Sequence, residues 1–328
     1  MPKRYAVTGA GGFIGSRLVS CLRSHGHEVL AIVREQSANE SLRSAGAEVR
    51  VADVTDMSQL VDAFNGADGV FHLAALFNHP DKSWEDYRAV NVEGTLNVLR
   101  AAQEAGCQRV VHCSTVGVAT EAHPPPYNED TPYSPQPDDK YEVTKTEGEI
   151  AARQFAGENE ISLAVIRPAQ VYGPGDKSKS KFYKLVKKGV IVRPGKTKKH
   201  LIYIDDLCDA FLRAMTTEAA DGEVFLIAGP QSTPLEELVT LAAFELGVPV
   251  PRIRLPAMPV VVACTVVEKT CNLIGIKPFI FKRSMDFFTK SIECDTTKSQ
   301  RLLGISNQMS VDVGVKKTVE WLRSQALI

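Results

Sequence analysis

Tyr141 and Lys145 are the residues whose types and spacing best suit chemistry. They stand four apart in a segment of helical character, so both side chains would lie on one helix face. Tyrosine is normally a poor base because its pKa is near 10. A lysine ammonium one turn away favours the phenolate, which could then take a proton from a substrate hydroxyl. Alone, this spacing is more often that of a surface pair, so its context in the chain decides between the two interpretations.

A hydroxyl from a neighbouring strand would complete such a site by holding the substrate oxygen. Ser114 and Thr115 follow the apolar run Val110–Cys113, where we expect a fifth strand to end. Both are candidates, and the sequence leaves the choice between them open.

The stretch from Thr8 to Gly15 predicts where a nucleotide binds. Its glycines at positions 9, 12 and 15 follow the apolar residues Ala6 and Val7 and precede an amphipathic segment. A strand that turns sharply into a helix needs residues without a Cβ, and small residues let a pyrophosphate approach the helix N-terminus. A plain tight turn is the alternative, but the β-α-β pattern around it favours the nucleotide.

Arg34 bears on which dinucleotide would bind. It follows Glu28–Val33, an apolar run typical of a strand buried on both faces. In dinucleotide-binding folds, an acidic side chain at this strand end bonds the ribose 2′-hydroxyl, and a basic one suits a 2′-phosphate. Arg34 therefore favours NADP over NAD, with a solvated surface charge as the alternative.

Strands and helices alternate along the first two-thirds of the chain. Besides the strand that ends at Thr8, we expect strands at 28–33, 49–52, 69–73, 110–113, 161–167, 201–204 and 224–227, and helices at 12–25, 84–106, 139–157 and 205–215. This rhythm predicts an α/β protein with a Rossmann-type, doubly wound parallel sheet and a smaller, mostly helical C-terminal substrate domain. The expected boundaries are 1–167, completed by about 201–228, for the first domain, and 168–200 with 229–328 for the second.

Composition excludes several classes of protein. A net charge of -1 over 328 residues argues against a nucleic-acid partner. The seven cysteines are scattered without a Cys-x-x-Cys pair, so we expect neither a metal site nor a disulfide framework, but reduced thiols in a cytoplasmic protein.

One segment is apolar enough to be considered for contact with a membrane. The apolar run Leu255–Val267 is too short to span a bilayer, which needs about 20 residues. A buried helix is our first interpretation, and peripheral membrane contact through 255–277 is the alternative.

The lysine-rich stretch from Lys177 to Lys199 contains no acidic residue. It could bind a phosphate or an acyl-CoA-like anion. A solvated basic loop is at least as good an interpretation.

Taken together, these motifs resemble the extended short-chain dehydrogenases/reductases, in particular the NAD(P)-dependent epimerase/dehydratase and 3β-hydroxysteroid dehydrogenase group. The matching residues are Thr8-Gly9-Ala10-Gly11-Gly12-Phe13-Ile14-Gly15, Asp53, His72-Leu73-Ala74-Ala75, Asn91, Ser114-Thr115, Tyr141, Lys145, Arg167-Pro168, Val171-Tyr172-Gly173-Pro174-Gly175 and Tyr203-Ile204-Asp205-Asp206. They cover the first two-thirds of the chain in the order expected for that group.

The resemblance implies roles for the candidate catalytic residues. Tyr141 would be the acid/base, and Lys145 would bind the nicotinamide ribose and lower the tyrosine pKa. Thr115 would supply the catalytic hydroxyl, and Ser114 is the alternative. Asn91 would either support a proton relay or only tie a helix to a strand.

The resemblance also implies the binding residues, with NADP preferred and NAD as the alternative. Cofactor contacts are expected from Thr8, Gly9, Gly11, Gly12, Phe13, Ile14, Gly15, Arg34, Asp53, Val54, Leu73, Ala74, Ala75, Tyr141, Lys145, Pro168 and Val171. Substrate contacts are expected from Tyr172, Lys199 and His200. Helices 84–106 and 139–157 would form a homodimer contact.

The expected function is that of an oxidoreductase that interconverts a secondary alcohol and a ketone on a hydrophobic, steroid-like or flavonoid-like substrate. A nucleotide-sugar epimerase or dehydratase is the alternative within enzymes. A non-catalytic NADP-binding redox sensor is a third hypothesis, which the presence of both Tyr141 and Lys145 disfavours.

Overall fold

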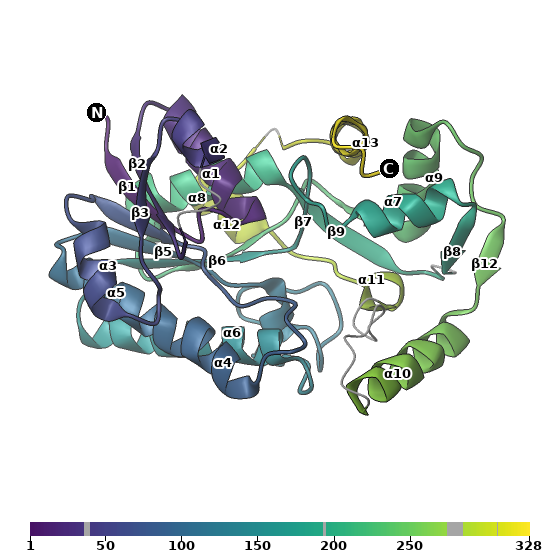
Figure 1. Ribbon diagram of the computed structural model, residues 1–328, viewed down its shortest axis with the longest axis horizontal. Helices are drawn as coiled ribbons and strands as arrows, with labels where there is room; N and C mark the ends of the chain where they lie inside the picture. The colour runs from purple at the N-terminus through teal and green to yellow at the C-terminus, as the bar shows by residue number, and fades with distance from the viewer. Residues whose placement is uncertain (36–39, 193–194, 274–284, 307) are drawn as a thin grey trace. The chain divides into compact units, whose positions relative to one another are not determined.

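The computed structural model describes residues 1–35, 40–192, 195–273, 285–306 and 308–328 (Figure 1). Its contacts divide the chain into two compact units. Unit 1 comprises Met1–Ala169, Ile204–Ala228 and Cys294–Asn307, and unit 2 comprises Gln170–Tyr203, Gly229–Glu293 and Gln308–Ile328. The segment Cys294–Asn307 therefore packs with unit 1, although the sequence-based boundaries place it in the second domain, with 229–328.

Seven parallel strands form the sheet of unit 1. They are β1 (Arg4–Thr8), β2 (Glu28–Val33), β3 (Glu48–Val51), β4 (Gly69–His72), β5 (Arg109–Cys113), β6 (Leu163–Pro168) and β10 (Val224–Ile227). Their order is β10-β6-β5-β4-β1-β2-β3, so the direction of winding reverses between β1 and β4. This doubly wound, Rossmann-type sheet confirms the expected fold class. In sheets of this kind, ligands bind outside the carboxyl ends of the strands where the winding reverses.

Helices cover both faces of this sheet. One face carries α1 (Phe13–Ser24), α8 (Ile204–Thr216) and α12 (Thr297–Leu303), and the other carries α3 (Met57–Phe64), α5 (Gly94–Glu104) and α6 (Lys140–Glu158), as Figure 1 shows. Short α2 (Glu40–Ser44) packs on β3. Strands covered on both sides read as continuous apolar runs, and every residue of β4 and β6 is buried.

The expected helix 84–106 is interrupted. It consists of α4 (Trp84–Arg88), a π turn over Ala89–Glu93, and α5. A π turn widens the helix by one residue and moves the side chains that follow. The buried side chain of Asn91 lies within this turn.

Unit 2 is mostly helical and contains two small sheets. Its helices are α7 (Ser180–Lys187), α9 (Leu235–Leu246), α10 (Ala257–Leu273), α11 (Asp286–Thr289) and α13 (Val311–Ser324). Its sheets have the orders β11-β9-β7 and β12-β8, from β7 (Gln170–Tyr172), β8 (Val190–Val192), β9 (Lys198–Tyr203), β11 (Ser232–Pro234) and β12 (Ile253–Leu255). The strand expected at 201–204 is thus part of β9 in unit 2, not part of the large sheet, because it pairs with β7 and β11.

The segment considered for membrane contact begins at the last residue of β12 and forms α10. The expectation of a buried helix is wrong, because Met258, Val262 and Val266 of α10 are exposed, although Cys264 is buried. Within the described ranges, no helix combines the length and the apolar character needed to cross a membrane. Of the segment 255–277, residues 274–277 lie outside the described part of the chain.

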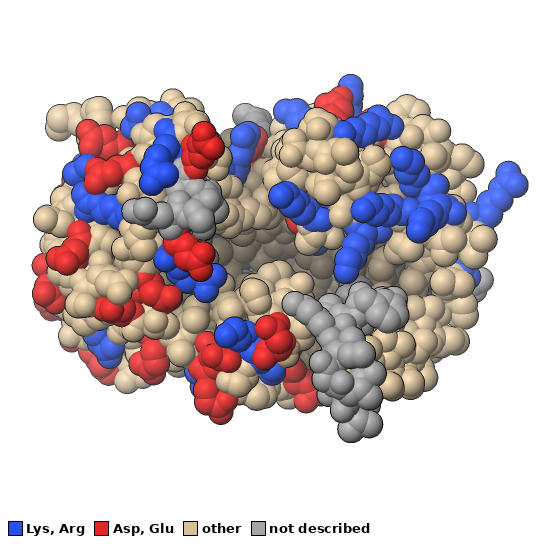
Figure 2. All heavy atoms as spheres, viewed as in Figure 1, with Lys and Arg blue, Asp and Glu red and all other residues tan. Residues whose placement is uncertain are grey.

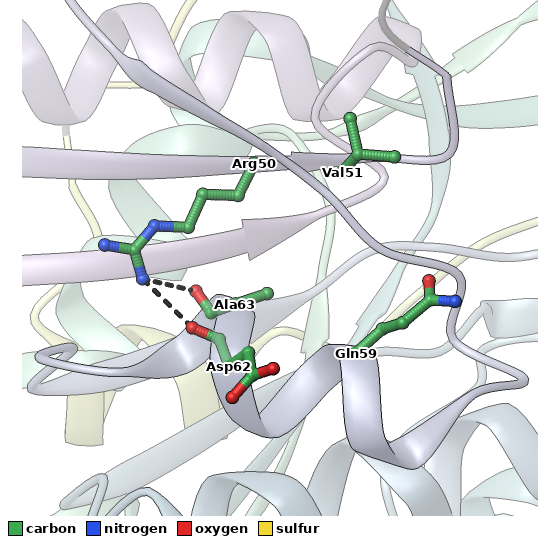
Figure 3. A pocket seen from close by; sticks show the side chains of 5 residues that line it. All are labelled: Arg50, Val51, Gln59, Asp62 and Ala63. Atoms are coloured by element: carbon green, nitrogen blue, oxygen red, sulfur yellow. Dashed lines mark hydrogen bonds between the residues drawn. The ribbon is translucent and has the colours of Figure 1, made fainter.

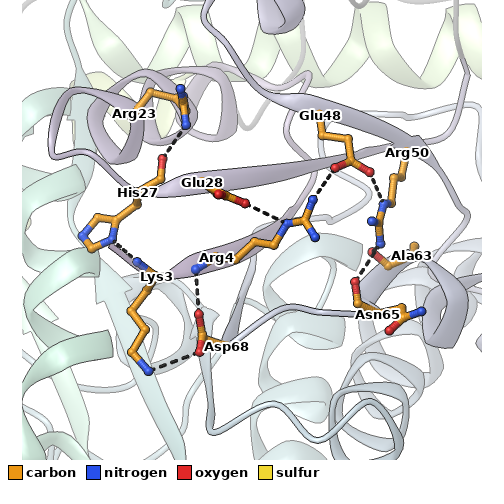
Figure 4. Close-up of polar contacts among 10 residues, drawn as sticks. All are labelled: Lys3, Arg4, Arg23, His27, Glu28, Glu48, Arg50, Ala63, Asn65 and Asp68. Atoms are coloured by element: carbon orange, nitrogen blue, oxygen red, sulfur yellow. Dashed lines mark hydrogen bonds and ion pairs between the residues drawn. The ribbon is translucent and has the colours of Figure 1, made fainter. Parts of the chain in front are cut away.

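Charged side chains join the amino ends of the strands (Figure 4). Arg4 pairs with Glu48 at 2.5 Å and with Glu28 at 3.3 Å, and Lys3 pairs with Asp68 at 3.2 Å. These pairs are partly exposed, so each contributes less than about 1 kcal/mol. The carboxyl ends, at the opposite edge of the sheet, are where the candidate site lies.

Candidate active site

The glycine turn after β1 is built so that side chains would not fit. Gly9 has a φ of 69°, and a Cβ there would lie 2.7 Å from the amide nitrogen of Ala74. A Cβ at Gly15 would lie 2.2 Å from the carbonyl oxygen of Gly9. In the described structure, α1 follows Gly12 without a side-chain cap, so N–H groups of its first turn remain for an anion. The turn therefore fits the pyrophosphate of a dinucleotide.

The other cofactor candidates of unit 1 lie at or just beyond the carboxyl ends of its strands. Arg34 is exposed immediately after β2. Asp53 follows β3, and its Oδ1 accepts hydrogen bonds from the backbone N–H and the hydroxyl of Thr55, at 2.9 and 2.8 Å. Leu73 and Ala74 are half-buried and Ala75 is exposed after β4, while Val54 and Pro168 are buried.

Helix α6 positions the tyrosine and the lysine. Asp139 caps it, since its Oδ1 accepts hydrogen bonds from the N–H groups of Tyr141 at 2.9 Å and Glu142 at 3.1 Å. Tyr141 is half-buried, and its ring meets that of Phe77 edge-on with 4.8 Å between centroids. Lys145 lies one turn further along the same face.

The Lys145 amine is buried against β5. The side chain is 1% exposed, and its Nζ lies 3.3 Å from Nε2 of His112. Burial lowers the pKa of Lys145 to about 8, although the Cys113 thiol and the Glu149 carboxylate act in the opposite direction. The lysine can therefore gain or lose its proton close to neutral pH.

Asn91 links three parts of unit 1. Its Oδ1 accepts a hydrogen bond from the Leu76 N–H at 2.8 Å, and its Nδ2 donates to the Thr144 hydroxyl at 2.9 Å. Gly148 lets α6 approach closely, because a Cβ there would lie 2.2 Å from the Asn91 carbonyl oxygen. These contacts fit the second of the two roles considered for Asn91, a tie between helix and strand end.

Ser114 and Thr115 have different environments, although they are adjacent. Ser114 is 1% exposed and donates a hydrogen bond to Oε2 of Glu149 at 2.5 Å. Thr115 is half-buried, and its Oγ1 accepts a hydrogen bond from the Gly117 N–H at 3.2 Å. Thr115 retains a hydroxyl proton that it can donate.

Glu149 is a residue that the sequence analysis misses. It is fully buried one turn beyond Lys145, and it pairs with Arg167 at 2.6 Å. The Tyr133 hydroxyl also donates to its Oε1, at 2.9 Å. The spacing of four from Lys145 was the available signal, because it continues the face that carries Tyr141 and Lys145.

A row of buried polar side chains crosses the central strands, and the two histidines in it had no expected role. Thr8, His72 and His112 are neighbours in the register of β1, β4 and β5. The Thr8 hydroxyl lies 2.8 Å from Nδ1 of His72, and the Thr95 hydroxyl lies 3.0 Å from its Nε2. Histidines inside apolar strand runs were the signal that could have found them.

Lys199, one of the substrate candidates, lies in unit 2 with its amine turned inward. The side chain is 0% exposed, and its Nζ donates to the carbonyl oxygen of Asp286 at 3.1 Å and to that of Lys290. Burial lowers the pKa of Lys199 to about 7. In the described structure, this amine binds the first residue of α11 and the residue that follows its last turn.

The other candidates of unit 2 are engaged within it as well. Nε2 of His200 lies 2.9 Å from the carbonyl oxygen of Gly229. The Tyr172 ring packs edge-on against Tyr203, with 5.6 Å between centroids. Val171, a cofactor candidate, is half-buried in β7.

The basic stretch is only partly a loop, since it contains β8 and the start of β9. Helix α7 lies within it, and Figure 2 shows lysines and arginines gathered on the face of unit 2. The exposed members are Lys177, Lys181, Lys184, Lys187, Lys188, Lys196 and Lys198. Arg193 lies outside the described residues.

A shallow depression lies away from these residues, between β3 and α3 (Figure 3). It is lined by Arg50, Val51, Gln59, Asp62 and Ala63. The Arg50 guanidinium already donates to the carbonyl oxygens of Asp62 and Ala63, at 3.3 and 3.1 Å. Since none of the candidate residues lines it, we do not consider it a reaction site.

Comparison with known proteins agrees with this geometry. The NAD dependent epimerase/dehydratase family model matches residues 5–228. The 3beta-hydroxysteroid-dehydrogenase/decarboxylase isoform 1 of Arabidopsis thaliana is 28% identical over 86% of this chain and 68% of its own length. The UDP-glucose 4-epimerase of Vibrio cholerae is 26% identical over 98% of this chain and 95% of its own.

One similar protein of known structure was solved with its ligands bound. MoeE5 in complex with UDP-glucose and NAD is 26% identical to this chain, with a TM-score of 0.76 over 98% of this chain and 99% of that one.

The family match covers more than half of the chain. The chain therefore belongs to the NAD dependent epimerase/dehydratase family, and it is an NAD-dependent dehydrogenase or epimerase of the extended short-chain dehydrogenase/reductase kind.

Proposed function

We propose that the protein is an NADP-preferring oxidoreductase that interconverts a secondary alcohol and a ketone on a hydrophobic substrate. The observation that supports this most is on α6, where a half-buried tyrosine, Tyr141, stands one turn from Lys145 with its buried amine. The relative named as a 3beta-hydroxysteroid-dehydrogenase/decarboxylase supports the substrate class.

The residues of this chain would transfer the proton of the substrate hydroxyl and bind the substrate oxygen. Tyr141 would take the hydroxyl proton as phenolate, or return it as phenol. The Lys145 ammonium would favour the phenolate, and the Thr115 hydroxyl would donate a hydrogen bond to the substrate oxygen. Thr115 is preferred to Ser114 because the Ser114 proton is already donated to Glu149. A bound nicotinamide cofactor supplies the hydride acceptor or donor.

The choice of NADP rests on Arg34. The glycine turn would hold the pyrophosphate, and Arg34 is exposed at the end of β2, where the ribose of the adenosine is expected. A guanidinium there would form charge-assisted hydrogen bonds with a 2′-phosphate.

A nucleotide-sugar epimerase is the second candidate. It is favoured by the UDP-glucose 4-epimerase relative, which matches 98% of this chain, and by MoeE5, whose structure contains UDP-glucose. In an epimerase the hydride is removed and then returned, so the cofactor shows no net change. This difference separates the two candidates.

The test combines purified protein with NADP or NAD and either a 3β-hydroxysteroid or UDP-glucose. We expect net cofactor reduction with the steroid, faster with NADP, and a loss of at least about 100-fold in Tyr141→Phe, since acid–base catalysis contributes 10²–10⁴. Arg34→Ala should lose the preference for NADP by about tenfold, as expected for one charge-assisted hydrogen bond. Arg43→Ala, which removes an exposed arginine from α2, is the matched control.

Conversion of UDP-glucose to an epimer without net cofactor change would overturn the proposal in favour of the second candidate. Cofactor binding without any turnover would instead favour the redox sensor.

We also propose a homodimer in the cytoplasm. By the family resemblance, α4, α5 and α6 would form the contact between copies, and the exposed Ile150 on α6 fits an apolar contact. The seven cysteines are free thiols, which suits a reducing compartment. Light scattering during gel filtration checks the assembly, and a mass of one chain would exclude the dimer.

A further inference from the structure

Two neighbouring buried histidines of the sheet differ in how their nitrogens are used. The Thr95 hydroxyl donates to the Asn91 carbonyl oxygen at 2.8 Å, so it accepts a hydrogen bond from Nε2–H of His72. The Thr8 hydroxyl then donates to Nδ1 of the same ring, 2.8 Å away. His72 is therefore a neutral imidazole with both nitrogens occupied, and burial lowers its pKa to about 3.

His112 has no such pair of partners. It lies beside His72 in the register of β4 and β5, with 5.2 Å between ring centroids and 30° between planes. Its Nε2 lies 3.3 Å from the Lys145 amine. Its Nδ1 is buried without a hydrogen-bond partner among the described residues. The ring is held in place by packing, and its polar contact is directed at the lysine.

Titratable groups of β4, β5 and α6 interact with the lysine amine. From β4 comes His72, whose pKa is lowered by burial and by the Lys145 charge. From β5 come His112 and the Cys113 thiol, and α6 contributes the Glu149 carboxylate. That carboxylate is already bound by Arg167 and by the Ser114 hydroxyl. Nε2 of His112 lies within hydrogen-bond distance of the amine, and it accepts a hydrogen bond from the amine in the tautomer that carries the ring proton on Nδ1.

We propose that His112 is a positioning residue whose Nε2 holds the Lys145 amine in place and in its charged form. An acceptor that binds the ammonium favours that form over the neutral amine. The inference rests on the proposed function, because the charge of Lys145 matters there by keeping Tyr141 ready to lose its proton. It assigns His112 a role in the reaction that is exerted through Lys145.

The test measures the pKa of Lys145 directly. Protein labelled with carbon-13 lysine is titrated by NMR, and the Lys145 signal is identified by its absence in Lys145→Met. His112→Phe keeps a ring and removes the acceptor, and it should lower the pKa of Lys145 by about one unit, the equivalent of one such hydrogen bond. His112→Gln, which carries an acceptor at the end of a similar side chain, should restore most of the wild-type value.

Two controls keep the result interpretable. His25→Gln, at an exposed position beyond α1, should leave the Lys145 titration unchanged. If His112→Phe does not fold, His112→Asn replaces it, because its amide ends short of the Nε2 position. An unchanged pKa in a folded variant without the acceptor would overturn the proposal, as would a failure of His112→Gln to restore it.

The titration needs no substrate, so its outcome is separate from that of the proposed function. Should steroid oxidation be found, the acidic limb of its pH–rate profile should move to higher pH in His112→Phe by a similar amount. This follows because the tyrosine loses the neighbouring charge that favours its phenolate. Absence of turnover with a shifted lysine would refute the proposed function and leave the role of His112 intact.

Discussion

Glu147 and Glu149, two residues apart on α6, each pair with an arginine in opposite surroundings. Glu149 and Arg167 are 2.6 Å apart with side chains 0% and 3% exposed. Glu147 and Arg88 are 2.9 Å apart with side chains 37% and 50% exposed. Removing one partner of a buried pair leaves an uncompensated charge, whereas an exposed partner is solvated by water.

The two substitutions should therefore differ in cost. Glu149→Gln is expected to lower the free energy of unfolding by about 3–5 kcal/mol, because Arg167 then keeps a buried charge without its counter-ion. Glu147→Gln, the matched control on the same helix, should cost less than about 1 kcal/mol. Urea unfolding of both variants measures the difference. Equal losses would show that burial does not govern these pairs.

Helix α6 brings the candidate site together, and much of that could be predicted from the sequence. Asp139 is a typical N-cap residue, and the four-residue spacing of Tyr141 and Lys145 places them on one face. The central strands of unit 1 were equally visible, because strands covered on both sides are mostly apolar. Local pattern was enough wherever one element decided the outcome.

Other features depended on contacts between distant segments, so the sequence could not reveal them. The π turn at Ala89–Glu93 has the same apolar pattern as the helix around it. The close approach of Gly148 to the Asn91 carbonyl oxygen forms only when the chain is folded. The choice between Ser114 and Thr115 depends on which of them faces Glu149. Lys199 belongs to a basic stretch, yet its amine is enclosed by the segment around α11.

Two buried lysines give the whole molecule a distinctive dependence on pH. Burial lowers the pKa of Lys145 to about 8 and that of Lys199 to about 7, from an ordinary value of 10.5. Between these values and 10.5 the unfolded chain binds protons that the folded protein does not. Stability contributed by these groups should therefore rise as the pH increases from about 7 to 10.5.

Substitution of Lys199 should flatten this rise. We expect Lys199→Met to reduce the slope of the unfolding free energy against pH by roughly 1 kcal/mol per pH unit, because one proton no longer distinguishes the two states. The loss of its bonds to two carbonyl oxygens changes the stability at every pH and not the slope. Urea unfolding at several pH values measures the slope. Lys181→Met, at an exposed position of α7, serves as control, and a slope equal to that of Lys199→Met would contradict the prediction.

The strand order also has a consequence for how the protein is made. Six of the seven strands of the large sheet lie within Met1–Ala169, but β10 follows only after the first segment of unit 2. On the ribosome, a nascent chain could assemble those six strands early, with β6 as its open edge. An unpaired edge is a site for aggregation. Synthesis must therefore continue through Ile227 before that edge is covered, and a pause within unit 2 would prolong the exposure of β6.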